Sequence, residues 1–277
     1  MLDEHIVPAG FGVMPVLFTV GGVQIESYSF FVLLGIILAG GLFFYLSRKD
    51  KSKSSSASAT VSSTIVSNSE SAWIIGAAAI LGGAIGSKLP LLFLYWNQIF
   101  SGEIGWNFLF YGKTITGGIL GGIIGVIIVK KWLGIKSRKG NYFAPAIALG
   151  IAVGRLGCFF RGCCAGKPTS LPWGVNFGDG ILRHPTQIYE SIFCLCLMVY
   201  LLCRKNAKPG QLMDEFILIY FTWRFFIEFI RIEPLLGWLT VYQWISLAAI
   251  VYVFVKRKFF FGANDAELAR KQKTKLN

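Results

Sequence analysis

Long apolar stretches recur along the chain, separated by short polar or basic segments. Each stretch is close to the roughly 20 residues that an α-helix needs to cross the hydrocarbon core of a bilayer. None has the apolar–polar alternation of a membrane-spanning strand, and backbone in lipid must otherwise satisfy its own hydrogen bonds as helix. The pattern predicts an all-α, polytopic membrane protein with about seven transmembrane helices, at residues 28–47, 73–96, 110–133, 141–160, 185–203, 211–231 and 237–256.

Basic residues gather just beyond the ends of alternate predicted helices. They occur in SRKDKSK, KKWLGIKSRK, RKNAK and VKRK, which follow the first, third, fifth and seventh stretches. Lysine and arginine are enriched in the cytoplasmic loops of membrane proteins. The formal net charge of +13 is therefore a topology signal rather than a surface for nucleic acid. It predicts an N-terminus outside and a C-terminus in the cytoplasm.

The composition, 54% hydrophobic and only 15% charged, excludes a water-soluble globule. We expect residues 1–277 to form a single transmembrane domain. The serine-rich segment 47–71 predicts a flexible cytoplasmic loop, and residues 262–277 predict a charged cytoplasmic tail. The N-terminal segment MLDEHIVPAG has two acidic residues and no lysine, so we expect the first helix to be retained as an anchor rather than cleaved.

Polar residues at membrane depth gather at one side of this predicted topology. An ionisable side chain inside a membrane is a functional hypothesis by default, although an arginine near a helix end often extends to the headgroups instead. Arg224 and Glu228 are four residues apart, so they share a helix face and can pair, and Arg231 continues the same stripe. The residues that map to the outer half are Arg155, His184, Glu190, Arg224 and Glu228.

This group suits the recognition of an anionic lipid headgroup. The planar guanidinium of arginine matches phosphate oxygens and stays charged when it is partly buried, so two arginines on different helices would form a clamp. His184 is the single histidine of the predicted membrane part and is a candidate for proton transfer. The alternative is that His184 only caps the fifth helix beside Pro185.

Three motifs carry a resemblance to a known family. GRLG at 154–157, RHPTQIYE at 183–190 and YFTWRFFIEFIR at 220–231 occur together with TGGILGG and LTVYQWIS. In this order and spacing they resemble the bacterial prolipoprotein diacylglyceryl transferases. The resemblance implies a seven-span enzyme of the inner membrane, with its active site toward the outer leaflet. Such an enzyme moves the diacylglyceryl group of phosphatidylglycerol onto the lipobox cysteine of a prolipoprotein and releases glycerol phosphate, without a metal or organic cofactor.

The resemblance also implies roles for individual residues. Arg155 and Arg224 would contact the phospholipid phosphate, Glu228 would support that site, and His184 completes the expected catalytic set. The expected substrate-binding residues are Tyr28, Arg155, Gln187, Tyr189, Glu190, Tyr220, Arg224 and Arg231. The implied partners are phosphatidylglycerol, the prolipoprotein lipobox segment and membrane lipid, with no nucleic acid.

The chain departs from the family at positions that bear on chemistry. Thr116 stands before the paired glycines where the family has histidine, Cys158 replaces an asparagine, and Arg161 and Cys163 replace an asparagine and a glutamate. Three alternatives follow. His184 or Glu228 takes the proton, or the chain is a paralogue that uses a phospholipid donor with another acceptor, or it is a noncatalytic protein that binds or transports anionic lipid.

Cys158, Cys163 and Cys164 form a separate candidate site. Their spacing does not match the usual zinc patterns, so we expect no metal site. A disulfide between Cys158 and Cys163 or Cys164 is chemically allowed outside the cytoplasm. A thiolate beside Arg155 could also accept the lipid group covalently, because nearby cations lower a thiol pKa. A redox membrane protein built on these cysteines is a further alternative.

Overall fold

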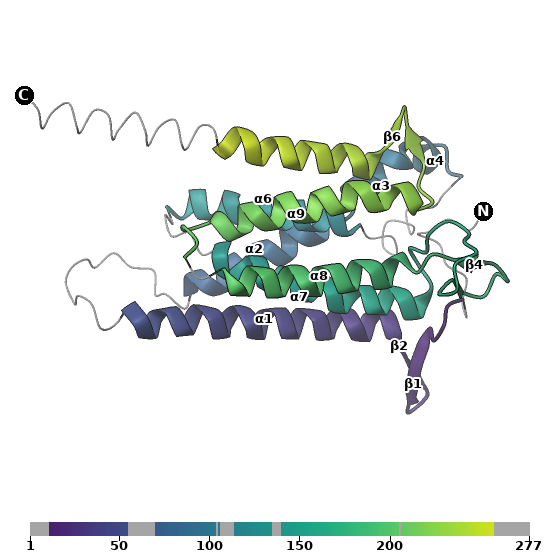
Figure 1. Ribbon diagram of the computed structural model, residues 1–277, viewed down its shortest axis with the longest axis horizontal. Coiled ribbons are helices and arrows are strands. Elements are labelled where there is room, and N and C mark those ends of the chain that lie inside the picture. The colour runs from purple at the N-terminus through teal and green to yellow at the C-terminus, as the bar shows by residue number, and fades with distance from the viewer. Residues whose placement is uncertain are drawn as a thin grey trace, which may run out of the picture.

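The computed structural model describes residues 11–54, 70–103, 105, 114–134, 140–204 and 206–257. Long helices run side by side along the longest axis, and β-hairpins gather at one end of the bundle (Figure 1). The long helices are α1 (Ser27–Ser54), α2 (Glu70–Gly86), α6 (Ile115–Trp132), α7 (Gly140–Arg161), α8 (Thr186–Cys203), α9 (Gln211–Ile227) and a last helix at 241–257. Two short helices, α3 (Leu89–Leu94) and α4 (Trp96–Phe100), follow α2.

Among these described residues, five segments are long and apolar enough to cross a membrane: Ser27–Lys49, Ile74–Leu94, Ile115–Trp132, Gly140–Arg161 and Thr186–Cys203. Their outward side chains are largely exposed apolar groups, such as Ile85 at 65% and Ile128 at 60%. In water such surfaces would be costly, whereas in lipid they are solvated. The prediction of an all-α, polytopic membrane protein is confirmed.

Several predicted boundaries differ from the structure. The predicted helix at 73–96 is interrupted after Gly86, so α2 and α3 are separate helices, and the helix predicted from 237 begins at 241, after β6. Helix α1 continues to Ser54, past the predicted end at 47, because SRKDKSKS contains no proline or glycine that would stop it. The predicted loop at 47–71 therefore begins later, and residues 55–69, like the predicted tail at 262–277, lie outside the described part. The predicted helix at 211–231 leaves α geometry at Ile227, where a 3₁₀ turn, Glu228–Ile230, follows.

Helix α7 is the centre of the bundle. It packs against α1, α8 and α9, and its small residues let the backbones approach closely. A Cβ added to Gly157 would lie 3.2 Å from the Tyr28 carbonyl oxygen, so this glycine sets the distance between α7 and α1. Ala148, Phe216 and Tyr220 belong to the buried core that joins α7, α8, α9 and the last helix.

Helices α2 and α6 meet through glycines. A Cβ on Gly86 would lie 2.5 Å from the Gly117 carbonyl oxygen, and one on Gly121 would lie 2.3 Å from that of Gly82. Such contacts leave no space for a side chain, and helices in lipid commonly associate in this way. The glycine-rich sequence ITGGILGG of α6 is therefore a packing surface.

Three antiparallel hairpins close one end of the bundle, called the hairpin end below (Figure 1). They pair β1 (Val16–Val20) with β2 (Val23–Glu26), β3 (Val175–Asn176) with β4 (Leu182–Arg183), and β5 (Leu235–Leu236) with β6 (Leu239–Thr240). The segment between α7 and α8 is tied to the end of α9, because Gly166 N–H donates to the His184 carbonyl at 2.9 Å and Lys167 N–H to that of Ile230 at 2.8 Å. The ends of α7, α8 and α9 are thereby held together.

Candidate active site

Glu190 lies at the centre of a buried group of polar side chains. It is on the first turns of α8 and is 1% exposed. Its carboxylate receives Nη2 of Arg155 from α7 at 2.5 Å and the hydroxyl of Tyr220 from α9 at 2.8 Å. Nη1 of Arg224 lies 3.9 Å away. Glu190 therefore brings two arginines from different helices, α7 and α9, to one point.

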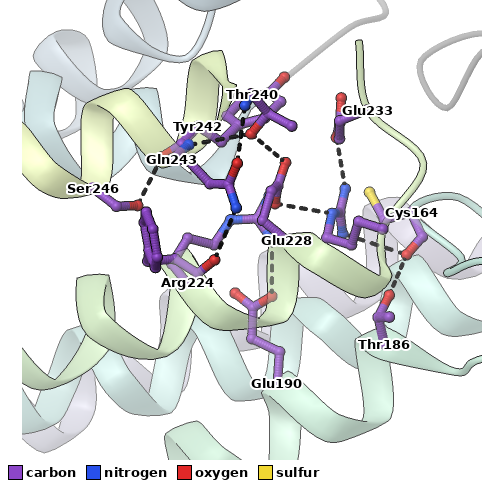
Figure 2. A network of polar contacts seen from close by, with 12 residues as sticks. Cys164, Thr186, Glu190, Arg224, Glu228, Glu233, Thr240, Tyr242, Gln243 and Ser246 are labelled. Atoms are coloured by element: carbon purple, nitrogen blue, oxygen red, sulfur yellow. Dashed lines mark hydrogen bonds and ion pairs between the residues drawn. The ribbon is translucent and has the colours of Figure 1, made fainter. Parts of the chain in front are cut away.

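Glu228 forms the second centre, on the 3₁₀ turn that follows α9. Nη2 of Arg224 lies 2.9 Å and Nε of Arg231 lies 3.5 Å from the same carboxylate oxygen. Thr240 donates its hydroxyl to the other oxygen at 3.2 Å. Figure 2 shows these contacts, with Arg224 between Glu190 and Glu228. The predicted pairing of Arg224 with Glu228 and the stripe that ends at Arg231 are confirmed.

These residues form a unit that we call the polar cluster: Arg155, Glu190, Tyr220, Arg224, Glu228 and Arg231. Glu233 adds a further ion pair to Arg231, at 2.9 Å. Every ion-paired side chain here is at most 4% exposed. Three guanidinium groups thus meet three carboxylates away from water. An unpaired charge at such a place would be expensive, so each ion in the cluster depends on its partners.

Arg224 also has an aromatic neighbour. Its guanidinium carbon lies 5.4 Å from the centre of the Tyr242 ring, within the range of a cation–π contact. Gln243 receives the backbone N–H of Thr240 and donates to the carbonyl of Phe225, at 2.9 and 3.3 Å. These residues of the last helix fix the position of Thr240 and line Arg224. Sequence reasoning did not name them as site residues, although the motif LTVYQWIS contains all three.

His184 and Tyr189 lie at a different place from the polar cluster. Nδ1 of His184 is 3.4 Å from the Tyr189 hydroxyl, which also accepts the indole N–H of Trp173 at 2.7 Å. We call these three residues the rim. His184 does not cap α8, because Pro185 occupies the cap position and no side chain bonds the helix end. The motif RHPTQIYE is therefore divided: Gln187 and Glu190 are buried, whereas His184 and Tyr189 are only partly covered.

Tyr28 lies on the other side of α7, near the start of α1. The guanidinium of Arg161 lies 5.3 Å from the centre of its ring. Asp179 and Arg183 form an ion pair at 2.6 Å on the loop before α8. Partial burial would raise the pKa of the Asp179 carboxyl, but the hydrogen bond and charge of Arg183 outweigh it, so this pKa lies below its ordinary value. Two further basic groups, Arg161 and Arg183, thus have partners of their own outside the polar cluster.

The three cysteines after GRLG are brought together by a tight turn. Gly162 and Cys164 have positive φ values of 82° and 65°, which fold the chain back after the last turn of α7. The sulfur atoms of Cys158, Cys163 and Cys164 all lie within 4.8 Å of one another, and all three are free thiols. The allowed disulfide is therefore not formed here. We call this group the thiol triad.

Thr116 is the residue that replaces the family histidine. It lies in α6 beside Gly117 and is 2% exposed. Within the described part of the chain its hydroxyl has no hydrogen-bond partner. A threonine hydroxyl does not accept a proton at neutral pH, so this position supplies no general base.

Comparison with known proteins agrees with this geometry. The family model for prolipoprotein diacylglyceryl transferase matches residues 15–256. A phosphatidylglycerol–prolipoprotein diacylglyceryl transferase of Clostridium tetani is 34% identical over 250 residues, which cover 86% of this chain and 94% of that protein. Proteins of the same name from Aliivibrio salmonicida and Bordetella bronchiseptica are 30% and 31% identical and cover 94% and 88% of this chain. The resemblance of the motifs is confirmed: the chain is a transferase-type membrane protein that belongs to the prolipoprotein diacylglyceryl transferase family.

Proposed function

We propose that this protein transfers the diacylglyceryl group of phosphatidylglycerol to the cysteine thiol of a prolipoprotein lipobox and releases glycerol phosphate. Family membership supports the reaction, since the relatives carry the two substrates in their names. The observation that carries the proposal is the convergence of Arg155 and Arg224, from α7 and α9, on one buried carboxylate. Two fixed guanidinium groups in a water-poor site suit a phosphate.

The reaction requires one bond to form and one to break. The thiol sulfur attacks the glyceryl carbon that carries the phosphodiester oxygen, and the carbon–oxygen bond breaks with its electron pair on the phosphate. Negative charge therefore grows on the leaving glycerol phosphate. Arg155 and Arg224 would stabilise this charge, and fixed donors in a site of low dielectric are most effective where charge develops.

The remaining residues of the polar cluster would position the arginines. Glu190 holds Arg155 with one carboxylate oxygen and accepts the Tyr220 hydroxyl with the other. Glu228 holds Arg224, and its carboxylate is itself fixed by Thr240 and Arg231. Gln187 donates to the Cys163 carbonyl at 2.6 Å and would keep the cysteine turn in place beside the lipid. Tyr28 and Tyr189 would line the two sides of the entrance.

His184 would accept the proton that the acceptor thiol loses. Glu190 already accepts from both Arg155 and Tyr220, which disfavours a further proton, and Glu228 stays the alternative acceptor. The ring of His184 is partly exposed and its Nδ1 lies 3.4 Å from the Tyr189 hydroxyl, and histidine is the side chain that most often transfers protons in enzymes. The hairpin end would face the outer leaflet of the inner membrane, with the N-terminus outside and the C-terminus in the cytoplasm, as the basic loops indicate.

The test is a reconstituted transfer reaction. Purified protein is mixed with phosphatidylglycerol labelled in its acyl chains and a lipobox peptide, and lipid-modified peptide and glycerol phosphate are measured. Arg155→Lys and Arg224→Lys are expected to lower the rate by about 10²-fold or more, because lysine lacks the two-pronged fork. Arg183→Lys, which changes the ion pair on the outer loop, is the matched control and should stay within a few-fold of wild type.

A protein that binds anionic lipid without chemistry is the second candidate, favoured by Thr116 and Cys163 at the positions of a family histidine and glutamate. Folded wild-type protein that binds phosphatidylglycerol through Arg155 and Arg224 but gives no product would support this candidate. The same result would overturn the transfer reaction. Folding is checked by a single, monodisperse elution and by helical content.

A further inference from the structure

We propose that the thiol triad is a zinc site whose fourth position takes the thiol of the acceptor cysteine, so that the metal activates the nucleophile. This inference rests on the proposed function and deepens it. It departs from the sequence-based expectation of no metal, which considered spacing along the chain and not the turn that brings the sulfurs together.

The geometry of the triad fits three zinc ligands. Zinc binds sulfur at about 2.3 Å, which places sulfur atoms about 3.8 Å apart in a tetrahedral site. The three sulfur atoms here lie within 4.8 Å of one another, so small side-chain rotations bring them to that distance. Cys158 is 5% exposed, whereas Cys163 and Cys164 are only partly buried. A bound ion would therefore keep one side open, as catalytic zinc sites do.

The backbone around the triad is held in a strained shape. Cys164 is the one described non-glycine residue with positive φ, a conformation that costs on the order of 1 kcal/mol or more. Its carbonyl oxygen receives the hydroxyl of Thr186 at 2.6 Å and Nη1 of Arg231 at 3.4 Å. Figure 2 shows Cys164 between Thr186 and the end of the polar cluster. Such strain is concentrated at functional sites, and here the strained turn places the three sulfur atoms close together.

The charges around the triad favour a metal–thiolate complex. Three thiolates around Zn²⁺ carry a net charge of −1, which needs a cation nearby. The guanidinium of Arg231 lies beside the triad, because its Nη1 donates to the Cys164 carbonyl at 3.4 Å. Arg231, together with Arg155 three residues before Cys158 on α7, thus places positive charge near the sulfur atoms, which favours thiolate ligands.

The site would perform the step for which Thr116 offers no base. Zn²⁺ replaces the three thiol protons of the triad, and the acceptor cysteine binds as fourth ligand and loses its own proton toward His184 and water. The zinc-bound thiolate attacks the glyceryl carbon held beside Arg155, and the carbon–oxygen electron pair leaves on glycerol phosphate. The product is a neutral thioether, a weaker ligand than a thiolate, so it dissociates from zinc.

The binding experiment uses full-length protein in detergent, reduced and stripped of metal by a chelator. Zinc is then added, and metal per chain is measured by elemental analysis after gel filtration. We expect one tightly held zinc per chain and at least a 10-fold weaker affinity for Cys158→Ser, Cys163→Ser and Cys164→Ser. Cys203→Ser, which removes an exposed thiol of α8, is the matched control and should bind zinc as wild type does.

Cobalt gives a readout that does not depend on catalysis. Co²⁺ at the triad should show sulfur-to-cobalt charge-transfer absorption in the near ultraviolet, and a lipobox peptide should change this spectrum while its Cys→Ser analogue should not. Absence of the absorption, binding that is unaffected by the three cysteine variants, or selective binding of Cu⁺ with no binding of Zn²⁺ would overturn the inference.

The transfer assay separates this inference from the proposed function. Activity that is lost on stripping and restored by zinc supports both. Equal transfer rates in stripped and zinc-loaded protein overturn the zinc site and leave the transferase in place. If the cobalt-loaded protein binds the peptide thiol but the zinc-loaded protein transfers no lipid, the transfer reaction is contradicted. The cobalt spectra would still support the metal site. A lipid adduct on Cys163 or Cys164, seen by mass spectrometry, would replace metal activation by a covalent route.

Discussion

The polar cluster and the rim come from the same stretches of sequence but differ in what surrounds them. In RHPTQIYE, Glu190 is 1% exposed and ion-paired, whereas His184 is partly covered and its ring lies beside the ring and hydroxyl of Tyr189. Loss of one partner in the cluster leaves a charge where water cannot reach it. At the rim, water can replace a lost partner. His184 and Glu190 are six positions apart in one motif, yet their surroundings differ, and we expect substitution of Glu190 to destabilise the fold more.

The largest effect is expected in the cluster. Glu190→Ala would leave Arg155 buried without its carboxylate and is expected to lower the free energy of unfolding by about 3–5 kcal/mol. Unfolding in mixed detergent micelles measures this change. Glu26→Ala, at an exposed position of β2, is the control and should change little. An equal loss in both variants would contradict the distinction between buried and exposed carboxylates.

At the rim, the expected effect is on activity. His184→Gln removes the proton acceptor and should lower kcat/KM about 10²–10⁴-fold at neutral pH, with little change in stability. Binding of phosphatidylglycerol should stay as in wild type, because the arginines are not touched. A transfer rate within a few-fold of wild type would remove His184 from the reaction.

A smaller loss is expected for Tyr220→Phe. The hydroxyl of Tyr220 donates to Glu190 at 2.8 Å in a place without solvent. Its removal leaves the second carboxylate oxygen of Glu190 without that donor and is expected to cost about 1–3 kcal/mol of unfolding free energy. Tyr189→Phe removes a hydroxyl of the same chemistry at the rim and should cost less. A greater loss for Tyr189→Phe would reverse the comparison.

The smallest effect concerns the outer ion pair of Asp179 and Arg183. Because the pKa of Asp179 is lowered in the folded protein, the pair stabilises the fold above the ordinary carboxyl value of 3.8 and loses its effect as pH falls through the lowered pKa. Asp179→Asn should cost less than about 1 kcal/mol at neutral pH. The difference from wild type should vanish in acid, which unfolding measured at several pH values can check.

Much of the fold follows from the sequence because each membrane helix must satisfy its own backbone. The apolar stretches at 141–160 and 185–203 differ from α7 and α8 by one residue at the ends. The length of the apolar stretch did not predict the end of α1. A helix that leaves the membrane ends where its local sequence stops it and not where the lipid ends. The 3₁₀ turn Glu228–Ile230 ends at a carbonyl that accepts the N–H of Lys167, a residue far away in the sequence, and the sequence pattern does not show this contact.

Part of the candidate site could be predicted from the sequence. Spacing of four predicted the Arg224–Glu228 pair, because helix geometry fixes it. The inward position of Glu190 depends on how α8 is rotated against α7, and the position of His184, just before α8, depends on its backbone pairing with Gly166 and Lys167; a single sequence contains neither. Thr240 and the sulfur contacts of the thiol triad arise from turns that bring distant ends together, so spacing along the chain gave no signal for them.

The polar cluster and Glu233 together contain three guanidinium groups and three carboxylates, and this balance has a consequence for the lipid. A phosphate that enters meets arginines whose charge is already paired with Glu190 and Glu228, although Nε of Arg155 and Nε and Nη1 of Arg224 have no hydrogen-bond partner among the described residues. It must compete with tethered carboxylates, which are always present at high effective concentration. The carboxylates of Glu190 and Glu228 would therefore act as reversible competitors of the lipid phosphate and weaken its binding. Between turnovers they would neutralise the charges of Arg155 and Arg224 in the bilayer.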